Sequence, residues 1–181
     1  GSGATATPVV IRGNLDSAAT IPTVTTFNST DPSSYTFTTS AAVYDSLGNQ
    51  HDLGMYFVKT STANQWSVHL QFDGVTTGAS PASVVTFDPS TGTFSTGTPS
   101  PIAVATTLTT GADPMAFNLD LQQFTQRRSG SAVFEISQDG SPPGEIASVS
   151  VSANGVVQGR YTNGETRDLG QVILATFRNP N

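Results

Sequence analysis

Apolar residues recur at every second position over several short stretches of the chain, and this period of two is the pattern of half-buried β-strands. The clearest stretch alternates polar residues with an apolar set made of Trp66, Val68, Leu70 and Phe72. Two further alternating stretches precede it, at residues 35–43 and 53–57. Because the breaks between the three stretches are short, we expect an antiparallel meander from Tyr35 to Asp73.

The turn between the first two predicted strands contains the residues that most resemble a chemical site. Asp45, His51 and Asp52 lie close together in a chain that has only 2 histidines. However, Asp45, Gly48 and Asn49 are residue types that tight turns require. His51 and Asp52 are strand neighbours, so their side chains point to opposite faces. We therefore interpret the cluster as a solvated hairpin tip rather than a metal or acid–base site, with a partner contact as a further alternative.

Between Gly74 and Ser131 the alternation weakens. Short strands are predicted around residues 84–87 and 115–121, and the sequence between them is rich in loop residues. The stretch "LDLQQFTQRRSG" could hold a short helical turn or an exposed loop. In either case, Arg127 and Arg128 are expected to be a solvated pair.

From Glu145 onward the alternation returns around two Asn-Gly pairs, Asn154-Gly155 and Asn163-Gly164. An Asn-Gly pair between alternating segments is a strong hairpin signal, because both central positions of a type I′ turn need a positive φ. The sequence therefore predicts a second meander in this part of the chain.

Two turn-rich stretches, residues 15–34 and 137–145, are candidate domain boundaries. We expect an all-β protein of two small β domains, built from antiparallel sheets as a sandwich or barrel, with an outer domain inserted into a middle one. The expected bounds are 4–21 and 145–181 for the middle domain and 22–144 for the outer domain. Residues 1–3 are interpreted as a cloning remnant, which suggests a fragment of a longer protein.

Composition narrows the classes of partner. The chain has 181 residues, a formal net charge of −6, and no cysteine. One lysine and no basic stripe make a nucleic-acid partner unexpected. Without cysteine there is neither a disulfide framework nor a thiolate metal site. No apolar run reaches the roughly 20 residues of a membrane helix and no signal peptide is apparent, so we expect a soluble protein with no membrane partner.

The sequence assigns no catalytic, cofactor-binding or metal-ligating residue. No serine lies in a Gly-x-Ser-x-Gly turn, and no Gly-rich phosphate loop or paired metal-ligand spacing occurs. Asp88, Asp113 and Asp139 each lie beside proline or glycine, as turn aspartates do. A hydrolase would need His51 or His69 buried beside a carboxylate, whereas His69 lies on the polar side of its strand and is expected to face solvent. We therefore expect no enzyme and no cofactor.

Residues 25–60 resemble the bacterial flagellar hook protein family, whose outer domain carries a "FNPSDPSSY" segment followed by "VYDSLGNxHxLxxYFVK". The matching residues are Phe27, Asp31, Ser34, Tyr35, Val43, Tyr44, Asp45, Ser46, Leu47, Gly48, Asn49, His51, Leu53, Tyr56, Phe57, Val58 and Lys59. The segment "VIRGNLDSAATIP" also resembles the start of the family's outer domain.

A second segment is similar to "Y-S/T-N-G-x-x-x-x-L-G-Q-I-x-L-A-x-F-x-N", which hook and rod proteins of the flagellar axis share. Its matches are Tyr161, Asn163, Gly164, Leu169, Gly170, Gln171, Leu174, Ala175, Phe177 and Asn179. This segment alone would not separate hook from rod, but the first one favours hook.

The resemblance implies a structural subunit of the flagellar hook, the flexible tube that transmits torque from motor to filament as a universal joint. It implies other hook subunits as partners, together with hook cap, rod and hook–filament junction proteins. The location would be extracellular, reached without a cleaved signal peptide. Since the family's helical terminal segments are absent, we expect a monomer in solution. We hypothesise that the Ser, Thr, Asn and Gln-rich surface lets neighbouring subunits slide through weak, water-bridged contacts.

The residues leave one alternative from another class, an extracellular β-sandwich adhesin or carbohydrate-binding module. Such modules are also acidic, rich in serine and threonine, and free of cysteine, but they expose aromatic side chains on one face for sugar stacking. Trp66 shares the parity of the apolar residues on its strand, so we expect it in the core. An exposed Trp66 beside Tyr35 or Tyr56 would favour this alternative.

Overall fold

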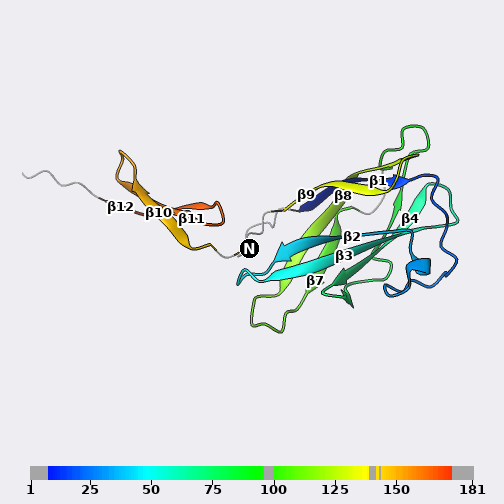
Figure 1. Cartoon of the computed structure of the whole chain (residues 1–181), viewed down its shortest axis with the longest axis horizontal. Helices are drawn as coiled ribbons and strands as arrows, with labels where there is room; N and C mark the ends of the chain where they lie inside the picture. The colour runs from blue at the N-terminus through cyan, green and yellow to red at the C-terminus, as the bar shows by residue number, and fades with distance from the viewer. Residues whose placement is uncertain (1–7, 96–99, 139–141, 143, 173–181) are drawn as a thin grey trace, which may run out of the picture. The chain divides into compact units, whose positions relative to one another are not determined.

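The computed structural model describes residues 8–95, 100–138, 142 and 144–172, which form strands and one short 3-10 helix (Figure 1). The chain divides into two compact units, Gly1–Gly140 and Ser141–Asn181. Within the described residues, no helix is long and apolar enough to cross a membrane. The all-β fold class predicted from the sequence is confirmed.

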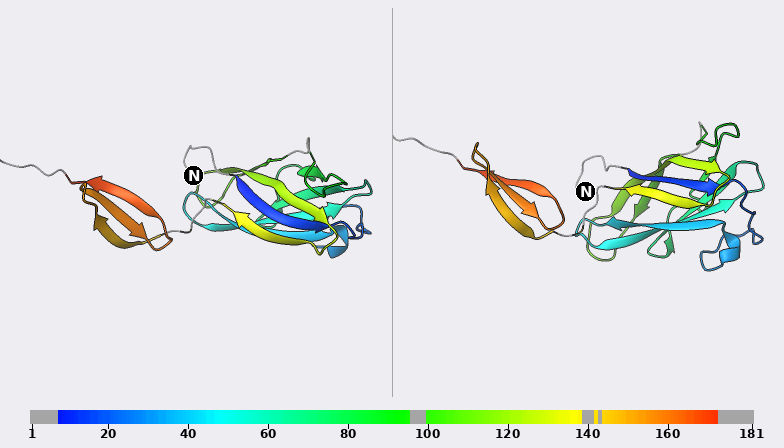
Figure 2. Two further views of the ribbon diagram at one scale, coloured as in Figure 1. Left: turned by 90° about the horizontal axis from the view of Figure 1, so that it is seen from above. Right: turned by 45° about the horizontal axis from the view of Figure 1, so that its top comes forward.

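The first unit is a sandwich of two β-sheets, visible as two layers in Figures 1 and 2. The first sheet contains, in spatial order, β7 (Ile102–Thr106), β8 (Met115–Arg127), β1 (Val9–Asp16) and β9 (Ala132–Ser137). β1 and β8 are parallel, and the other two pairs are antiparallel. The N-terminal strand therefore lies inside the sheet, between two strands from much later in the chain.

The second sheet is antiparallel throughout. Its order is β2 (Phe37–Tyr44), β3 (Gln50–Lys59), β4 (Gln65–Phe72) and β5 (Val75–Thr76), with β6 (Ser83–Thr86) also paired to β4. β2, β3 and β4 follow one another as neighbours in the sheet. This confirms the meander predicted from the period of two.

The core lies between the two sheets, where the alternating apolar residues of both are buried. Trp66 has no exposed surface, as its parity predicted, and its Nε1 donates to Oε1 of Gln126 on β8 at 2.8 Å. The rings of Phe57 and Phe124, one from each sheet, lie 5.3 Å apart. Burial of each such side chain contributes roughly 1.5–3 kcal/mol, so this interior is the main source of stability of the first unit.

β1 contributes to the same core. Ile11 and Leu15 have no exposed surface, and a Cβ added at Gly13 would lie 2.8 Å from the Phe124 ring. This placement differs from the expected domain bounds, in which residues 4–21 join 145–181 and residues 22–144 form a separate insertion. The physical reason is that the apolar side chains of β1 fill the interior of the sandwich.

The prediction of a helical turn or loop for residues 119–130 is wrong, because β8 continues as a strand to Arg127. A register shift against β1 falls between Val10 and Arg12. On β8 this shift lets Leu121 and Phe124, at odd and even positions, both point into the core. The bulge thus breaks the period of two on which the prediction relied.

The loop-rich stretch between the predicted strands also contains a strand that the sequence analysis missed. β7 buries Ile102 and Val104 against the core, while Ala103 and Ala105 are exposed. The alternation is therefore present, but it covers only a few residues between turn-rich flanks.

The second unit is a three-stranded antiparallel sheet in the order β10 (Ile146–Val151), β11 (Val156–Tyr161) and β12 (Thr166–Gln171). The second predicted meander is thus confirmed. Its turns differ in type from the prediction. Gly155 and Gly164 have φ of 77° and 87°, whereas the preceding asparagines are not among the described residues with positive φ. Each turn is therefore a type I turn closed by a glycine bulge.

One face of this small sheet is apolar, and we call it the apolar face. Val149 and Val151 lie opposite Gly159 and Val157 in the register of β10 and β11. Leu169 packs on Gly159, where an added Cβ would lie 2.9 Å from its Cδ1. Val149, Val151 and Leu169 are all exposed, at 55%, 62% and 47%. The sheet therefore exposes several large apolar side chains together on one face.

Candidate interaction site

The segment that joins β1 to β2, residues 17–36, crosses the outer face of the second sheet, and we call it the strap. Its far end is ordered by η1 (Pro32–Ser34), whose N-cap Asp31 accepts a hydrogen bond from the Ser33 N–H at 2.9 Å. Ser34 is fully buried, and its Oγ accepts the Asn28 N–H at 3.0 Å. The strap is thus folded by its own polar side chains.

The strap is also attached to the sheet beneath it. Gln71 on β4 donates from Nε2 to Ser29 Oγ at 2.8 Å. At the other end, Lys59 donates from Nζ to the carbonyl oxygens of Ser17 at 2.6 Å and Ala19 at 2.8 Å. Because a lysine is a point donor on a flexible stem, one side chain can bind both carbonyl groups. The only lysine of the chain therefore anchors the start of the strap.

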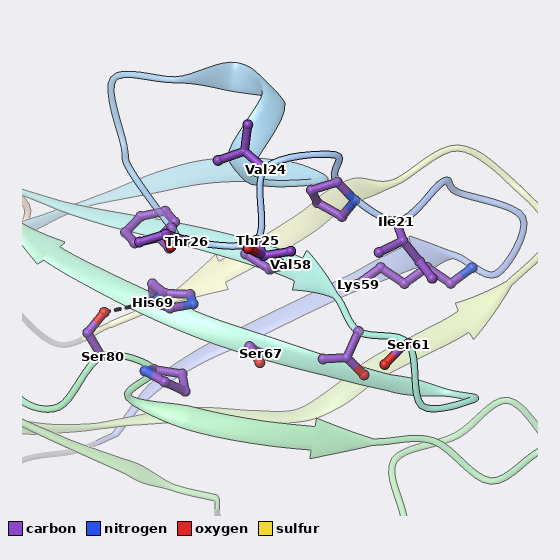
Figure 3. A pocket seen from close by; sticks show the side chains of 14 residues that line it. Ile21, Val24, Thr25, Thr26, Val58, Lys59, Ser61, Ser67, His69 and Ser80 are labelled. Carbon is purple, nitrogen blue, oxygen red and sulfur yellow. Dashed lines mark hydrogen bonds between the residues drawn. The ribbon is translucent and has the colours of Figure 1, made fainter.

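His69 lies beneath the strap, and the prediction that it faces solvent is wrong. Its side chain is on the outer face of β4, as its parity requires, but Phe27 of the strap stacks on it at a centroid distance of 4.1 Å. His69 Nδ1 lies 2.8 Å from Ser80 Oγ (Figure 3). Burial lowers the pKa of His69, which favours the neutral ring at physiological pH.

Two tyrosines extend this group of rings. Tyr56 lies 5.2 Å from Phe27 and 5.1 Å from Tyr35, in tilted and edge-on arrangements that aromatic pairs prefer. Both tyrosines are half-buried. The outer face of the sheet therefore carries aromatic residues, but Trp66 is not one of them, so the arrangement expected of a carbohydrate-binding face is not found.

A pocket of about 550 Å³ opens between the strap, the adjoining ends of β3 and β4, and Ser80-Pro81 (Figure 3). Its volume lies in the range of ligand and peptide sites. The apolar part of its lining comes from Ile21, Pro22, Val24, Phe27, Val58 and Pro81. Lys59 also lines it, and no aspartate or glutamate is among the described residues that do.

At the opposite end of β3, His51 joins two turns. Its Nδ1 lies 2.7 Å from Oδ2 of Asp73, and its Nε2 lies 3.3 Å from Oδ2 of Asp45. Asp52 points to the other face, as predicted, while its N–H donates to Asp73 Oδ1 at 2.9 Å. We call Asp45, His51 and Asp73 the histidine clasp. The sequence analysis missed Asp73, although extending the predicted β3–β4 pairing would have placed it near Asp52.

The carboxylates of the clasp favour the protonated form of His51. The hydrogen bond with Asp73 raises the pKa of His51, against the opposing effect of burial. Burial opposes ionisation of Asp45, but hydrogen bonds from Asn49, His51 and Leu47 lower its pKa to about 2. Asp45 and Asp73 are therefore both ionised and hydrogen-bonded to donors within the protein. These bonds hold the two turns together. Within the described part of the chain, no group of three or more His, Cys, Asp or Glu could hold a metal ion.

The remaining predicted turn residues have local roles. Asp88 accepts the N–H groups of Ser90 and Thr91 at 2.7 and 2.9 Å. Asp113 is exposed, whereas Asp139 lies outside the described residues. Arg127 and Arg128 are exposed, as expected. That the chain holds no catalytic, cofactor or metal site remains a prediction.

Comparison with known proteins gives a family for most of the first unit. The family described as "Flagellar basal body protein FlaE D2 domain" matches residues 14–141. Flagellar hook protein FlgE of Escherichia coli K12 is 35% identical over 177 residues, which are 97% of this chain and 43% of that protein. FlgE of Salmonella typhimurium is 33% identical over 169 residues, with 92% and 41% covered.

A crystal structure of Helicobacter pylori flagellar hook protein FlgE2 aligns with 75% of this chain and 32% of that one, at 18% identity and a TM-score of 0.47. The chain spans less than half the length of its curated relatives. The family match covers well over half of the chain and includes the strap, the pocket and the histidine clasp. The chain therefore belongs to the family of the flagellar basal body protein FlaE D2 domain.

Proposed function

We propose that this chain is a structural part of a flagellar hook subunit, in the flexible tube that transmits torque from the motor to the filament. The observation that carries the proposal is the 35% identity to a flagellar hook protein along 97% of the chain. Other hook subunits are then the principal partners, and hook cap, rod and junction proteins are further ones. The location is the extracellular hook, reached without a cleaved signal peptide, and the role is not enzymatic.

The contacts of the first unit suit a domain that transmits force. Its two sheets share one core. Hydrogen bonds join separate segments at both ends: Lys59 binds the strap at one end, and the histidine clasp joins two turns at the other. The polar outer surface allows water-bridged contacts with neighbours to be exchanged at small cost, which a tube that bends on every rotation requires. Stiff subunits with exchangeable contacts are the physical basis of the proposed universal joint.

The apolar face supports a further part of the proposal. Residues 145–181 belong to a middle β domain of the subunit, and the sandwich, with β1 as one of its strands, is the outer domain. A three-stranded sheet with an uncovered apolar face is marginally stable by itself. We expect this apolar face to be covered by another part of the subunit.

The proposal is tested by locating the protein on cells. An antiserum raised against the purified chain is applied to cells of the source organism and detected by immunogold electron microscopy. Gold is expected on the curved segment between cell body and filament. Serum pre-adsorbed with the same chain is the control. Specific labelling of the cell surface without labelling of the hook would contradict the proposal, and binding of the chain to a glycan array would then favour an adhesin.

A further inference from the structure

The two turns of the second unit have the same backbone arrangement. The first turn joins β10 to β11 and the second joins β11 to β12. In each, the glycine N–H donates to the carbonyl three residues earlier, from Gly155 to Ser152 at 2.9 Å and from Gly164 to Tyr161 at 3.1 Å. The bond that closes each hairpin also matches, at 2.9 and 2.8 Å. The turns therefore differ chiefly in the side chains around their asparagines.

An Asn-Gly pair can lose ammonia, because glycine has no Cβ to hinder its nitrogen. That nitrogen attacks Cγ of the asparagine, a bond forms between them, and the bond from Cγ to Nδ2 breaks. The amide nitrogen leaves as ammonia and carries the proton that the glycine nitrogen loses. Water then opens the succinimide ring at either carbonyl group and leaves aspartate or isoaspartate. The reaction thus requires only water and a Cγ that can move onto the glycine nitrogen.

In the second turn the side-chain amide of Asn163 is fixed. Its Nδ2 donates to the Pro142 carbonyl at 2.9 Å, and its Oδ1 accepts the Glu165 N–H at 3.1 Å. Gly144 packs on the same amide, since a Cβ added there would lie 2.6 Å from Cγ of Asn163. The carbon that would react is therefore covered, and it can move only if both hydrogen bonds break.

In the first turn the side chain of Asn154 is not restrained. It is exposed, and none of its side-chain atoms forms a hydrogen bond with the described residues. The backbone nearby is bound, because the Asn154 carbonyl accepts Gln171 Nε2 at 3.2 Å and the Gly155 carbonyl accepts the Val172 N–H at 2.7 Å. Neither of these bonds involves Cγ of Asn154 or the nitrogen of Gly155, which are the two reacting atoms.

One difference in sequence explains why only one asparagine is held. In the first turn, the Val156 N–H donates to Ser152 Oγ at 3.1 Å. Tyr161 occupies the place of this serine in the second turn, and its hydroxyl lies at the far end of a ring. The Glu165 N–H therefore donates to Asn163 instead. The serine of the first turn thus takes the donor that would otherwise hold the asparagine.

We propose that Asn154 is a site of spontaneous deamidation and that the contacts of Asn163 protect the second Asn-Gly pair. Either product adds one negative charge to the first turn, and isoaspartate also lengthens the backbone there. Turn length sets the register of a hairpin. Modification therefore loosens the pairing of β10 with β11 next to the turn. The inference concerns the chemistry of the chain itself and does not depend on the proposed function.

The test measures both asparagines in one sample of the full 181-residue chain. The chain is incubated in mildly alkaline buffer, digested with trypsin and analysed by mass spectrometry. Cleavage after Arg160 places Asn154 and Asn163 on different peptides. Asn154 is expected to deamidate several-fold faster than Asn163. The same incubation in guanidinium chloride is the control, and it is expected to bring the two rates close together because unfolding removes the contacts of Asn163.

A pair of glycine variants tests the cause of the protection. Gly144→Ala places a Cβ against Cγ of Asn163 and must displace its amide, so the rate at Asn163 is expected to rise several-fold. Gly170→Ala is the matched control, because an added Cβ there has nothing within 4 Å, and it is expected to leave that rate unchanged. Asn154 is the internal reference and is expected to keep its rate in both variants.

Three outcomes would overturn the inference. Equal rates at the two asparagines in the native chain, or a faster rate at Asn163, would mean that the contacts of Asn163 give no protection. An unchanged rate at Asn163 in Gly144→Ala would mean that its amide is not held where it reacts slowly. Acceleration of both asparagines in Gly144→Ala would show that protection comes from the fold of the whole unit rather than from these contacts.

Discussion

The two histidines of the chain lie in opposite electrostatic environments. His51 lies between two carboxylates, and its hydrogen bond with Asp73 raises its pKa above the ordinary 6.5. His69 lies under Phe27, no carboxylate of the described residues is recorded in contact with it, and burial lowers its pKa below 6.5. A histidine whose folded-state pKa is raised stabilises the fold at low pH, and one whose pKa is lowered stabilises it at high pH.

We predict opposite pH dependences for two single variants. His69→Gln retains the histidine clasp, whose stabilisation is full below pH 6.5 and is lost as the pH rises through the raised pKa of His51. His51→Gln retains His69, whose contribution is present above pH 6.5 and is lost as the pH falls through its lowered pKa. Urea unfolding at about pH 5.5 and pH 8.5 measures both. If the free energy of unfolding changed in the same direction between the two pH values in both variants, the assignment would be contradicted.

The size of the clasp's contribution follows from its exposure. A hydrogen bond to a charged group contributes about 1.5–3 kcal/mol when buried, and less when solvent reaches it. Since the Asp73 side chain is 49% exposed, His51→Gln is expected to cost about 1 kcal/mol near pH 6. An NMR titration of the two imidazole rings gives the pKa values directly.

At the scale of single residues, the sequence predicted which face of a strand a side chain lies on. It did not predict what covers that side chain. Trp66 is in the core, and Asp52 points away from His51, as the period of two requires. The burial of His69 could not be predicted, because it depends on Phe27, which lies 42 residues earlier and reaches the ring only when the strap folds. Contacts between distant segments leave no periodic signal at the residue they cover.

At the scale of elements, β2, β3 and β4 were predictable because each follows a regular alternation and is joined to the next by a short turn. β8 was predicted only in part, because its bulge against β1 changes the parity between Leu121 and Phe124. The parallel pairing of β1 with β8 joins positions more than a hundred residues apart. A local pattern contains no information on which distant strand completes a sheet, so the pairing of β1 with β8 was not predictable from it.

Two glycines in different turns allow the steric cost of a side chain to be separated from its conformational cost. Gly92 has φ of 69°, and a Cβ there would lie 2.6 Å from the carbonyl oxygen of Gln126 on β8. Gly111 has φ of 82° and nothing within 4 Å of the same position. Alanine at either site adopts a disfavoured backbone conformation, which costs about 1 kcal/mol. Alanine at Gly92 must also displace backbone.

We therefore predict that Gly92→Ala lowers the free energy of unfolding by about 2–3 kcal/mol and Gly111→Ala by about 1 kcal/mol. Urea unfolding of both variants measures the difference. Equal losses would mean that the close approach of residue 92 to β8 relaxes without cost.

The strap provides a second test at this scale. Lys59→Met keeps the apolar stem of the side chain but removes the donor to Ser17 and Ala19. Losing hydrogen bonds from a charged group is expected to cost about 1–2 kcal/mol. Amide exchange is expected to accelerate in residues 17–27 while β3 and β4 keep their protection. Uniform acceleration across the second sheet would show instead that Lys59 supports the whole sandwich.

At the scale of the whole molecule, the two units have separate sheets, and no described strand of β10–β12 pairs with a strand of β1–β9. The first unit has its own core from both sheets, whereas the second exposes the apolar face. Stability in a small β unit comes chiefly from apolar burial. We therefore expect the first unit to stay folded when separated and the second to lose its fold.

Truncation distinguishes the units directly. A chain ending at residue 138 is expected to unfold cooperatively with a Tm within about 3 °C of the full chain, because every described strand that buries the core is retained. A peptide of residues 142–172 is expected to show no cooperative transition, since one uncovered sheet cannot offset the conformational entropy of ordering it. Circular dichroism melting and two-dimensional amide NMR spectra measure both. A much lower Tm for the truncated chain would mean that the second unit stabilises the sandwich, and a folded peptide would remove the need for a segment to cover its apolar face.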